Sequence, residues 1–173
     1  LSLAEDSDEE SETEEVMPPQ VVSAYPAHLE SQPGVLIADS GCRAAVGGEV
    51  WHHRHQENLR EAGLEWKEIA EQEFYKFGAG PVVESQVKYR YHAFIEGHED
   101  YVEMSCVGGQ AANCPGLASP DEMQRWNMAV NYGNRTFQAM GSDWKPITYT
   151  PSGHPGIRIL ASGREPEPVI TPE

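Results

Sequence analysis

The chain has 173 residues, enough for one folded domain with terminal segments, because single hydrophobic cores usually occupy about 100 to 150 residues. It carries 28 acidic and 12 basic side chains and a formal net charge of -16. This balance argues against direct nucleic-acid binding, which needs clusters of Lys and Arg. No apolar run approaches the roughly 20 residues that span a bilayer, so we expect no membrane partner.

Acidic side chains are concentrated at the start of the chain. Residues 1–42 hold ten of them and no Lys or Arg, so they account for 10 of the 16 net negative charges. A segment this polar and this charged cannot bury enough apolar surface to offset its chain entropy. We therefore expect residues 1–20 to be an acidic disordered tail. A docking or adaptor role for this tail is the alternative to a solvated linker.

The cellular context is indicated by the cysteines and by the first residue. Cys42, Cys106 and Cys114 have neither secretory context nor metal-type spacing, which favours reduced thiols in a cytosolic setting. Since the first residue is Leu1 rather than Met, we expect the chain to be a segment of a longer polypeptide.

Strand patterns dominate residues 21–141, which we expect to form the folded domain. The expected strands cover 35–38, 66–69, 73–77, 82–95, 101–107, 128–132 and 136–140. The spacing of Trp51, His55 and Leu59 predicts an amphipathic helix over 49–62. A second short helix over 120–127 is predicted by Ser119 as its cap, with proline next and acids in its first turn. Residues 142–173 are rich in Pro and Gly and predict an extended tail.

A long hairpin is predicted around the triplet Gly78-Ala79-Gly80. Its returning arm, 82–95, alternates apolar and polar side chains with the period of two that a strand requires. The glycine-rich tip predicts a mobile lid, although an ordinary hairpin turn has the same composition.

The run Ile37-Ala38-Asp39-Ser40-Gly41 delivers a carboxylate from an apolar strand into a Ser-Gly turn. A carboxylate at the end of a buried strand is a candidate general acid or base. Asp-Ser-Gly is also an ordinary turn tripeptide, so the context has to decide between chemistry and turn geometry.

The order and spacing of these motifs resemble the retropepsins, the dimeric aspartic proteases of retroviruses and retrotransposons. Asp39-Ser40-Gly41-Cys42 is similar to their active-site turn, Phe77-Gly78-Ala79-Gly80 to the tip of their flap, and the segment 117–132 to their apolar pair, helix and final strand. The chain resembles most closely the protease region of copia-like retrotransposon polyproteins from dinoflagellate genomes. The further residues that carry this likeness are Leu36, Arg43, Gly47, Trp51-His52, Asn113-Cys114-Pro115 and Val130-Asn131-Tyr132-Gly133.

The resemblance implies a mainly β fold, a closed retropepsin-like barrel with one or two short helices. It also implies an endopeptidase without metal or cofactor that processes a polyprotein in the cytoplasm or inside a virus-like particle. Asp39, Ser40 and Gly41 would be catalytic, with the Ser40 hydroxyl hydrogen-bonded across or beneath the pair of acids and the Gly41 N–H close to a carboxylate oxygen. The implied substrate-binding residues of flap and pocket are Phe77, Gly78, Ala79, Gly80, Val82 and Leu117, with Val83 as a further pocket candidate.

Aspartic proteolysis needs two carboxylates that share a proton, and no second Asp-Thr/Ser-Gly occurs in the 173 residues. We therefore expect a homodimer in which Asp39 of each copy meets across a two-fold axis. The alternative function is a catalytically silent module of the same fold that dimerises or binds peptides.

Two other chemistries are weighed against this one. Cys42 precedes a histidine-rich stretch, but the adjacent Asp39 raises the pKa of a thiol and so disfavours a Cys-His nucleophile. His52, His53 and His55 could suggest a metal site. On a helix, however, His53 points away from the other two, so we expect buried and surface histidines and no metal.

Overall fold

The computed structural model describes residues 33–151 and 153–160. Its strands are β1 (Val35–Ala38), β2 (Val46–Gly48), β3 (Lys67–Lys76), β4 (Val82–Ile95), β5 (His98–Val107), β6 (Leu117–Ala118), β7 (Ala129–Asn131), β8 (Thr136–Gln138), β9 (Lys145–Pro146), β10 (Thr148–Tyr149) and β11 (Pro155–Arg158). Its helices are α4 (Glu49–Glu61), the 3-10 turn η1 (Gly109–Ala111) and α5 (Pro120–Arg125). None of these described helices is long and apolar enough to cross a membrane.

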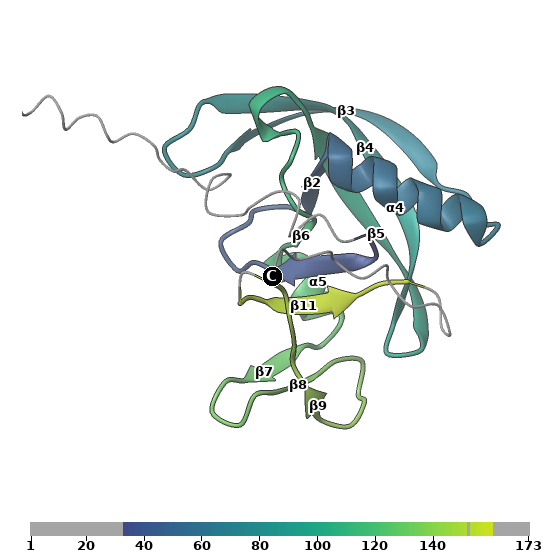
Figure 1. Ribbon diagram of the computed structural model, residues 1–173, viewed down its shortest axis with the longest axis vertical. Helices are drawn as coiled ribbons and strands as arrows, with labels where there is room; N and C mark the ends of the chain where they lie inside the picture. Colours follow the sequence, from purple (N-terminus) through teal and green to yellow (C-terminus); the bar gives the residue numbers. More distant parts are fainter. Residues whose placement is uncertain (1–32, 152, 161–173) are drawn as a thin grey trace, which may run out of the picture.

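The described chain is mainly β, as expected from the sequence. One sheet has eight strands in the order β10-β11-β1-β6-β2-β5-β4-β3, and a second has three in the order β7-β8-β9. Figure 1 shows the small sheet projecting at one end of the molecule and α4 lying near the long strands at the other. The strands predicted over 35–38 and 82–95 are confirmed at both ends, and α4 matches the predicted helix within one residue.

The expected closure into a barrel is wrong, because the large sheet is open and ends at β10 and β3. The reason lies in the long hairpin. β4 pairs with β3 from Val82 to Arg90 but with β5 only from Val87 onward. The part of the hairpin nearest its tip is therefore a two-stranded arm that leaves the sheet instead of closing it. β3 is also one strand with an irregularity between Ala70 and Glu73, where two separate strands were expected.

The expected boundary at residue 141 is also wrong. β11 pairs antiparallel with β1, with Val35 opposite Arg158 and Ile37 opposite Gly156, and both Ile157 and Ile159 are buried. The extended tail predicted over 142–173 thus supplies a strand of the main sheet. Proline concealed this strand, since Pro155 stands at its first residue, one of the places where a strand tolerates a missing N–H. Residues 161–173 and the acidic tail expected over 1–20 lie outside the described residues.

Two buried side chains of helix α4 form hydrogen bonds to the backbone at the start of β1. The indole N–H of Trp51 donates to the carbonyl of Val35 at 3.2 Å, and the backbone N–H of Gly34 donates to Nδ1 of His55 at 3.1 Å. The ring of His55 stacks on that of Trp51 with centroids 4.7 Å apart. The predicted apolar stripe of this helix therefore packs against the strand that leads to Asp39.

The third buried ring of α4, His52, binds two other strands of the same sheet, β4 and β5. His52 Nε2 donates to the carbonyl of Ser105 on β5 at 2.9 Å, so its Nδ1 accepts from the hydroxyl of Tyr91 at 2.6 Å. His53 is exposed on the opposite face of the helix. The histidines are thus divided between core and surface.

The two buried histidines make stability depend on pH. Burial lowers the pKa of His52 to about 4, and burial together with the neighbouring His52 lowers that of His55 to about 3. In an unfolded chain both pKa values are near 6.5. The stability that these neutral rings contribute is complete above pH 6.5 and is lost as the pH falls below it, because the unfolded chain then takes up protons that the fold excludes.

We expect the free energy of unfolding to fall by about 1.4 kcal/mol per pH unit for each of the two rings once the pH is well below 6.5. Urea unfolding at about pH 7 and about pH 5.5 measures this. His52→Gln and His55→Gln are expected to reduce the loss, and His53→Gln on the exposed face is the control. An equal loss in all three variants would show that other groups cause it.

Candidate active site

Asp39 follows directly on β1 and is positioned by β6. The two strands are parallel, with Ile37 opposite Leu117 and Ala38 opposite Ala118. The backbone N–H of Asp39 continues this pairing by donating to the carbonyl of Ala118 at 3.0 Å. β6 also pairs with β2, so it lies between two strands that are consecutive in the chain. The loop from β1 to β2 must therefore pass around β6, with Asp39 at its start.

The turn after β1 contains the three residues predicted to be catalytic, Asp39, Ser40 and Gly41. Gly41 donates its backbone N–H to Oδ1 of Asp39 at 2.9 Å, which is the contact expected from the sequence. Cys42 closes the turn by donating its N–H to the carbonyl of Asp39 at 3.1 Å. Asp39 is half-buried, whereas Ser40 and Gly41 are exposed. Within the described residues the Ser40 side chain makes no hydrogen bond, so its expected bond across a dyad stays a prediction.

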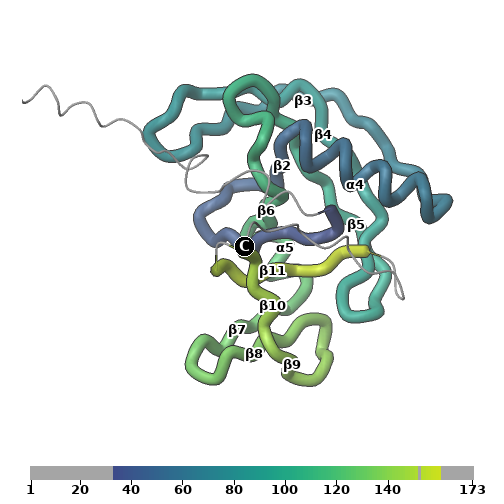
Figure 2. The backbone as a smooth tube through the Cα atoms, viewed as in Figure 1, coloured from purple at the N-terminus to yellow at the C-terminus, as the bar shows by residue number. Residues whose placement is uncertain are grey.

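The tip of the β3–β4 hairpin lies on the same side of the molecule as this turn (Figure 2). The tip is closed by a hydrogen bond from Gly80 N–H to the carbonyl of Phe77 at 3.1 Å. Gly78 has a φ of 62°, in the left-handed region that glycine adopts at the lowest cost. The ring of Tyr75 stacks on that of Phe77 with centroids 6.2 Å apart, which connects the tip to the arm behind it.

A cavity of about 450 Å³ separates the turn from the hairpin. It is lined by Asp39, Gly41, Cys42, Arg43, Phe74, Tyr75, Lys76, Phe77, Gly78 and Leu117. Five of the nine residues predicted for the site are in this set. Ser40, Ala79, Gly80 and Val82 are not among the residues lining it in this single chain.

Five further residues line the cavity: Cys42, which was considered only as a nucleophile, and Arg43, Phe74, Tyr75 and Lys76, which were not predicted for the site. The last three are the residues that lead into the glycine tip, so their place in the hairpin could have indicated them. Arg43 lies only four positions beyond Asp39 and could have been found from that proximity.

Arg43 connects the turn to the hairpin. Its Nη2 donates to the carboxylate of Glu73 and to the backbone carbonyl of Phe74, each at 3.1 Å. Its guanidinium also lies 5.9 Å from the centre of the Tyr75 ring. These two hydrogen bonds from one planar group join the Asp39 loop to the β3 arm.

The base of the same arm is held by a chain of hydroxyl groups. Tyr75 donates to Oγ of Ser105 at 2.8 Å, and Ser105 donates to the carboxylate of Glu71 at 2.6 Å. Ser85 donates to the same carboxylate oxygen at 2.6 Å. Burial raises the pKa of Tyr75 to about 12, so its hydroxyl keeps its proton and remains the donor at neutral pH.

Cys42 does not provide a nucleophile. Burial first, and then the negative charge of Asp39, raise the pKa of its thiol to about 12. The thiol donates to the carbonyl of Ala44 at 2.8 Å. Its side chain packs in the smaller apolar cluster with Ile37 and Leu117.

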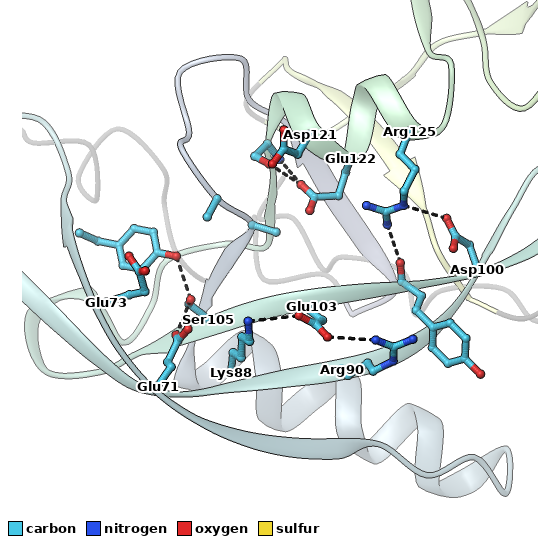
Figure 3. Close-up of a pocket in the computed structure, with 15 residues that line it drawn as sticks. Glu71, Glu73, Lys88, Arg90, Asp100, Glu103, Ser105, Asp121, Glu122 and Arg125 are labelled. Carbon is cyan, nitrogen blue, oxygen red and sulfur yellow. Dashed lines mark hydrogen bonds and ion pairs between the residues drawn. The ribbon is translucent and has the colours of Figure 1, made fainter.

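A larger cavity of about 510 Å³ lies beside the site but does not include Asp39. Figure 3 shows its charged side chains, which come from β3, β4 and β5 on one side and α5 on the other. Lys88 and Arg90 both bind Glu103, at 3.2 and 3.0 Å, and Arg125 binds Asp100 at 3.3 Å. These groups satisfy one another, so the cavity is a polar contact zone between the sheet and α5.

Comparisons with family models, curated proteins and solved structures gave no match to this chain. Within the described residues no group of three His, Cys, Asp or Glu side chains could hold a metal ion.

We expect Arg43→Ala to loosen the hairpin, because both hydrogen bonds to β3 are lost. Exposed ion pairs contribute about 0.2 to 1 kcal/mol, so amide exchange over residues 73–83 is expected to quicken by up to about fivefold. Hydrogen exchange followed by mass spectrometry measures this. Exchange in 98–107 is expected to stay unchanged, and Arg60→Ala, an exposed change on α4, is the control. Unchanged exchange at 73–83 in Arg43→Ala would disprove the clamp.

Proposed function

We propose that this protein is a homodimeric aspartic endopeptidase of the retropepsin type. The observation that carries the proposal is a single carboxylate, Asp39, in an exposed turn that faces a hairpin across a cavity. Asp39 is the one acidic residue among the described residues that line this cavity. Since peptide hydrolysis by carboxylates needs a pair, a second copy of the chain supplies the other.

In the proposed reaction, one Asp39 carboxylate accepts a proton from a water molecule as that water attacks the peptide carbonyl. The other, protonated, donates to the carbonyl oxygen. The N–H of Gly41 orients the carboxylate to which it is bonded. The hydroxyl of Ser40 is assigned to the contact between the two turns, because it is exposed beside Asp39 in the single chain.

The substrate is an extended peptide that lies between the turn and the hairpin as an added strand. Leu117 and Phe77 supply the apolar walls of the cavity. Ala79, Gly80 and Val82 reach the peptide or the second copy when the hairpin closes over it, which excludes water from the reaction. The natural substrate is the polyprotein that contains the protease, in the cytoplasm or within a virus-like particle.

The requirement for two copies can be tested by mixing. When wild-type and Asp39→Asn chains are refolded together, activity is expected to follow the square of the wild-type fraction, about one quarter at equal amounts, because only wild-type pairs hold a complete dyad. Release of a fragment from the parent polyprotein is the readout. Asp143→Asn, an exposed substitution outside the site, is the control and leaves activity unchanged.

A linear dependence on the wild-type fraction would mean that one chain is sufficient, and activity in pure Asp39→Asn would remove Asp39 from catalysis. A wild-type protein that dimerises and binds peptides but cleaves none would be the silent module instead.

The pH dependence of cleavage tests the shared proton. A fully protonated pair lacks the base and a fully ionised pair lacks the acid, so the rate is expected to rise and then fall with two limbs on the acidic side of neutrality. The folded fraction is measured at each pH, because the buried histidines also lower stability in acid. A rate that increases steadily through neutral pH would contradict a carboxylate dyad.

A further inference from the structure

The cavity beside Asp39 is lined by two cationic side chains, Arg43 and Lys76. Lys76 ends the β3 arm, opposite Val82, and its side chain is exposed. In the described part of the chain it pairs with no carboxylate. An ammonium group beside a substrate cavity and without an internal partner is available to a carboxylate brought by a ligand.

Arg43 adds a second group of the same charge. Only its Nη2 is engaged by Glu73 and Phe74, so the N–H groups on Nε and Nη1 have no partner among the described residues. The pair with Glu73 is exposed, with 66% and 41% of the two side chains accessible, so it competes weakly with another carboxylate. A guanidinium with a free edge binds a carboxylate through two parallel hydrogen bonds.

The neighbouring cavity in Figure 3 does not offer the same chemistry. Its three cations, Lys88, Arg90 and Arg125, are each within 3.3 Å of a carboxylate oxygen of the same cavity. Of the cations that line these two cavities, Lys76 on the Asp39 side is the one that pairs with no carboxylate of the described chain.

Resting on the proposed function, we propose that this cavity selects peptides with an Asp or Glu side chain close to the scissile bond, and that Lys76 and Arg43 determine this specificity. A substrate of this class is present in the chain itself. Residues 1–42 hold ten acidic side chains without a single Lys or Arg, and in residues 11–20 three glutamates precede the apolar pair Val16-Met17.

The overall charge of the protein works against nonspecific binding of such a peptide. A chain with a net charge of -16 repels an acidic peptide at long range, so a preference for it must arise from local cations. A measured preference for the acidic peptide would therefore be caused by the cations of the cavity and not by the net charge of the protein.

The test uses the Asp39→Asn protein, which keeps the cavity without cleaving, and a fluorescent peptide of residues 11–20. The comparison peptide has Gln in place of Glu12, Glu14 and Glu15. We expect the acidic peptide to bind at least about fivefold more tightly in fluorescence anisotropy, with the ratio falling as salt screens the charges. Adding Lys76→Glu is expected to abolish the preference.

Lys67→Glu is the matched control, because it makes the same charge change at an exposed residue at the far end of the same strand. It is expected to keep the preference. Equal binding of the two peptides, or an equal effect of Lys67→Glu and Lys76→Glu, would overturn the proposal. If activity follows the square of the wild-type fraction but the two peptides bind equally, the specificity proposal fails and the protease assignment stands. If the acidic peptide is preferred but no cleavage depends on Asp39, the protease assignment fails and the cavity is a peptide-binding site only.

Discussion

The pairing of β1 on both of its edges is the constraint on which the site depends. β11 binds one edge antiparallel and β6 binds the other parallel, and Val35, Leu36 and Ile37 are all buried between them. A strand with both edges paired cannot shift register without breaking two ladders and exposing its apolar side chains. Trp51 of α4 binds the carbonyl of Val35, and His55 accepts from the N–H of Gly34 just before the strand. The position of Asp39 is therefore fixed by the core, while its carboxylate reaches the surface.

The hairpin that faces Asp39 is built in the opposite way. Near its tip the hairpin is a two-stranded arm without a third strand, and isolated two-stranded ribbons are marginally stable in water. Its position relies on side chains: Tyr75 bonds to Ser105 at the base, and Arg43 bonds to Glu73 from the Asp39 loop. A rigid carboxylate opposite a weakly held arm is the arrangement that a closing lid over a bound peptide requires.

The sequence predicts well the features that depend on local periodicity. The alternation over 82–95, the glycine tip and the stripe of α4 each give an element at its observed place. The sequence does not predict the strands whose formation depends on pairing with distant segments of the chain. β2 and β6 are three and two residues long, too short for any period, and become strands only because each completes the ladder of a neighbour. β11 is concealed by proline and glycine, and closure depends on how far β5 follows β4. The same limit applies to part of the site: closeness to Asp39 in the chain could have indicated Arg43, but its contacts with Glu73 and Phe74 of β3 depend on tertiary structure.

The surface around Asp39 supports the case for a second copy. Ser40 and Gly41 are exposed at the turn, and Phe74 and Val82 on the hairpin arm are 53% and 60% exposed although both are large and apolar. In a single chain these groups face water, and the carboxylate of Asp39 has no acidic neighbour among the residues that line its cavity. A two-fold partner would change all three conditions together, since it covers apolar surface, gives the Ser40 hydroxyl an acceptor and supplies the second carboxylate. Under the proposed function the turn is therefore one half of a site, and the groups it lacks are of the kinds that the same turn of another copy contains.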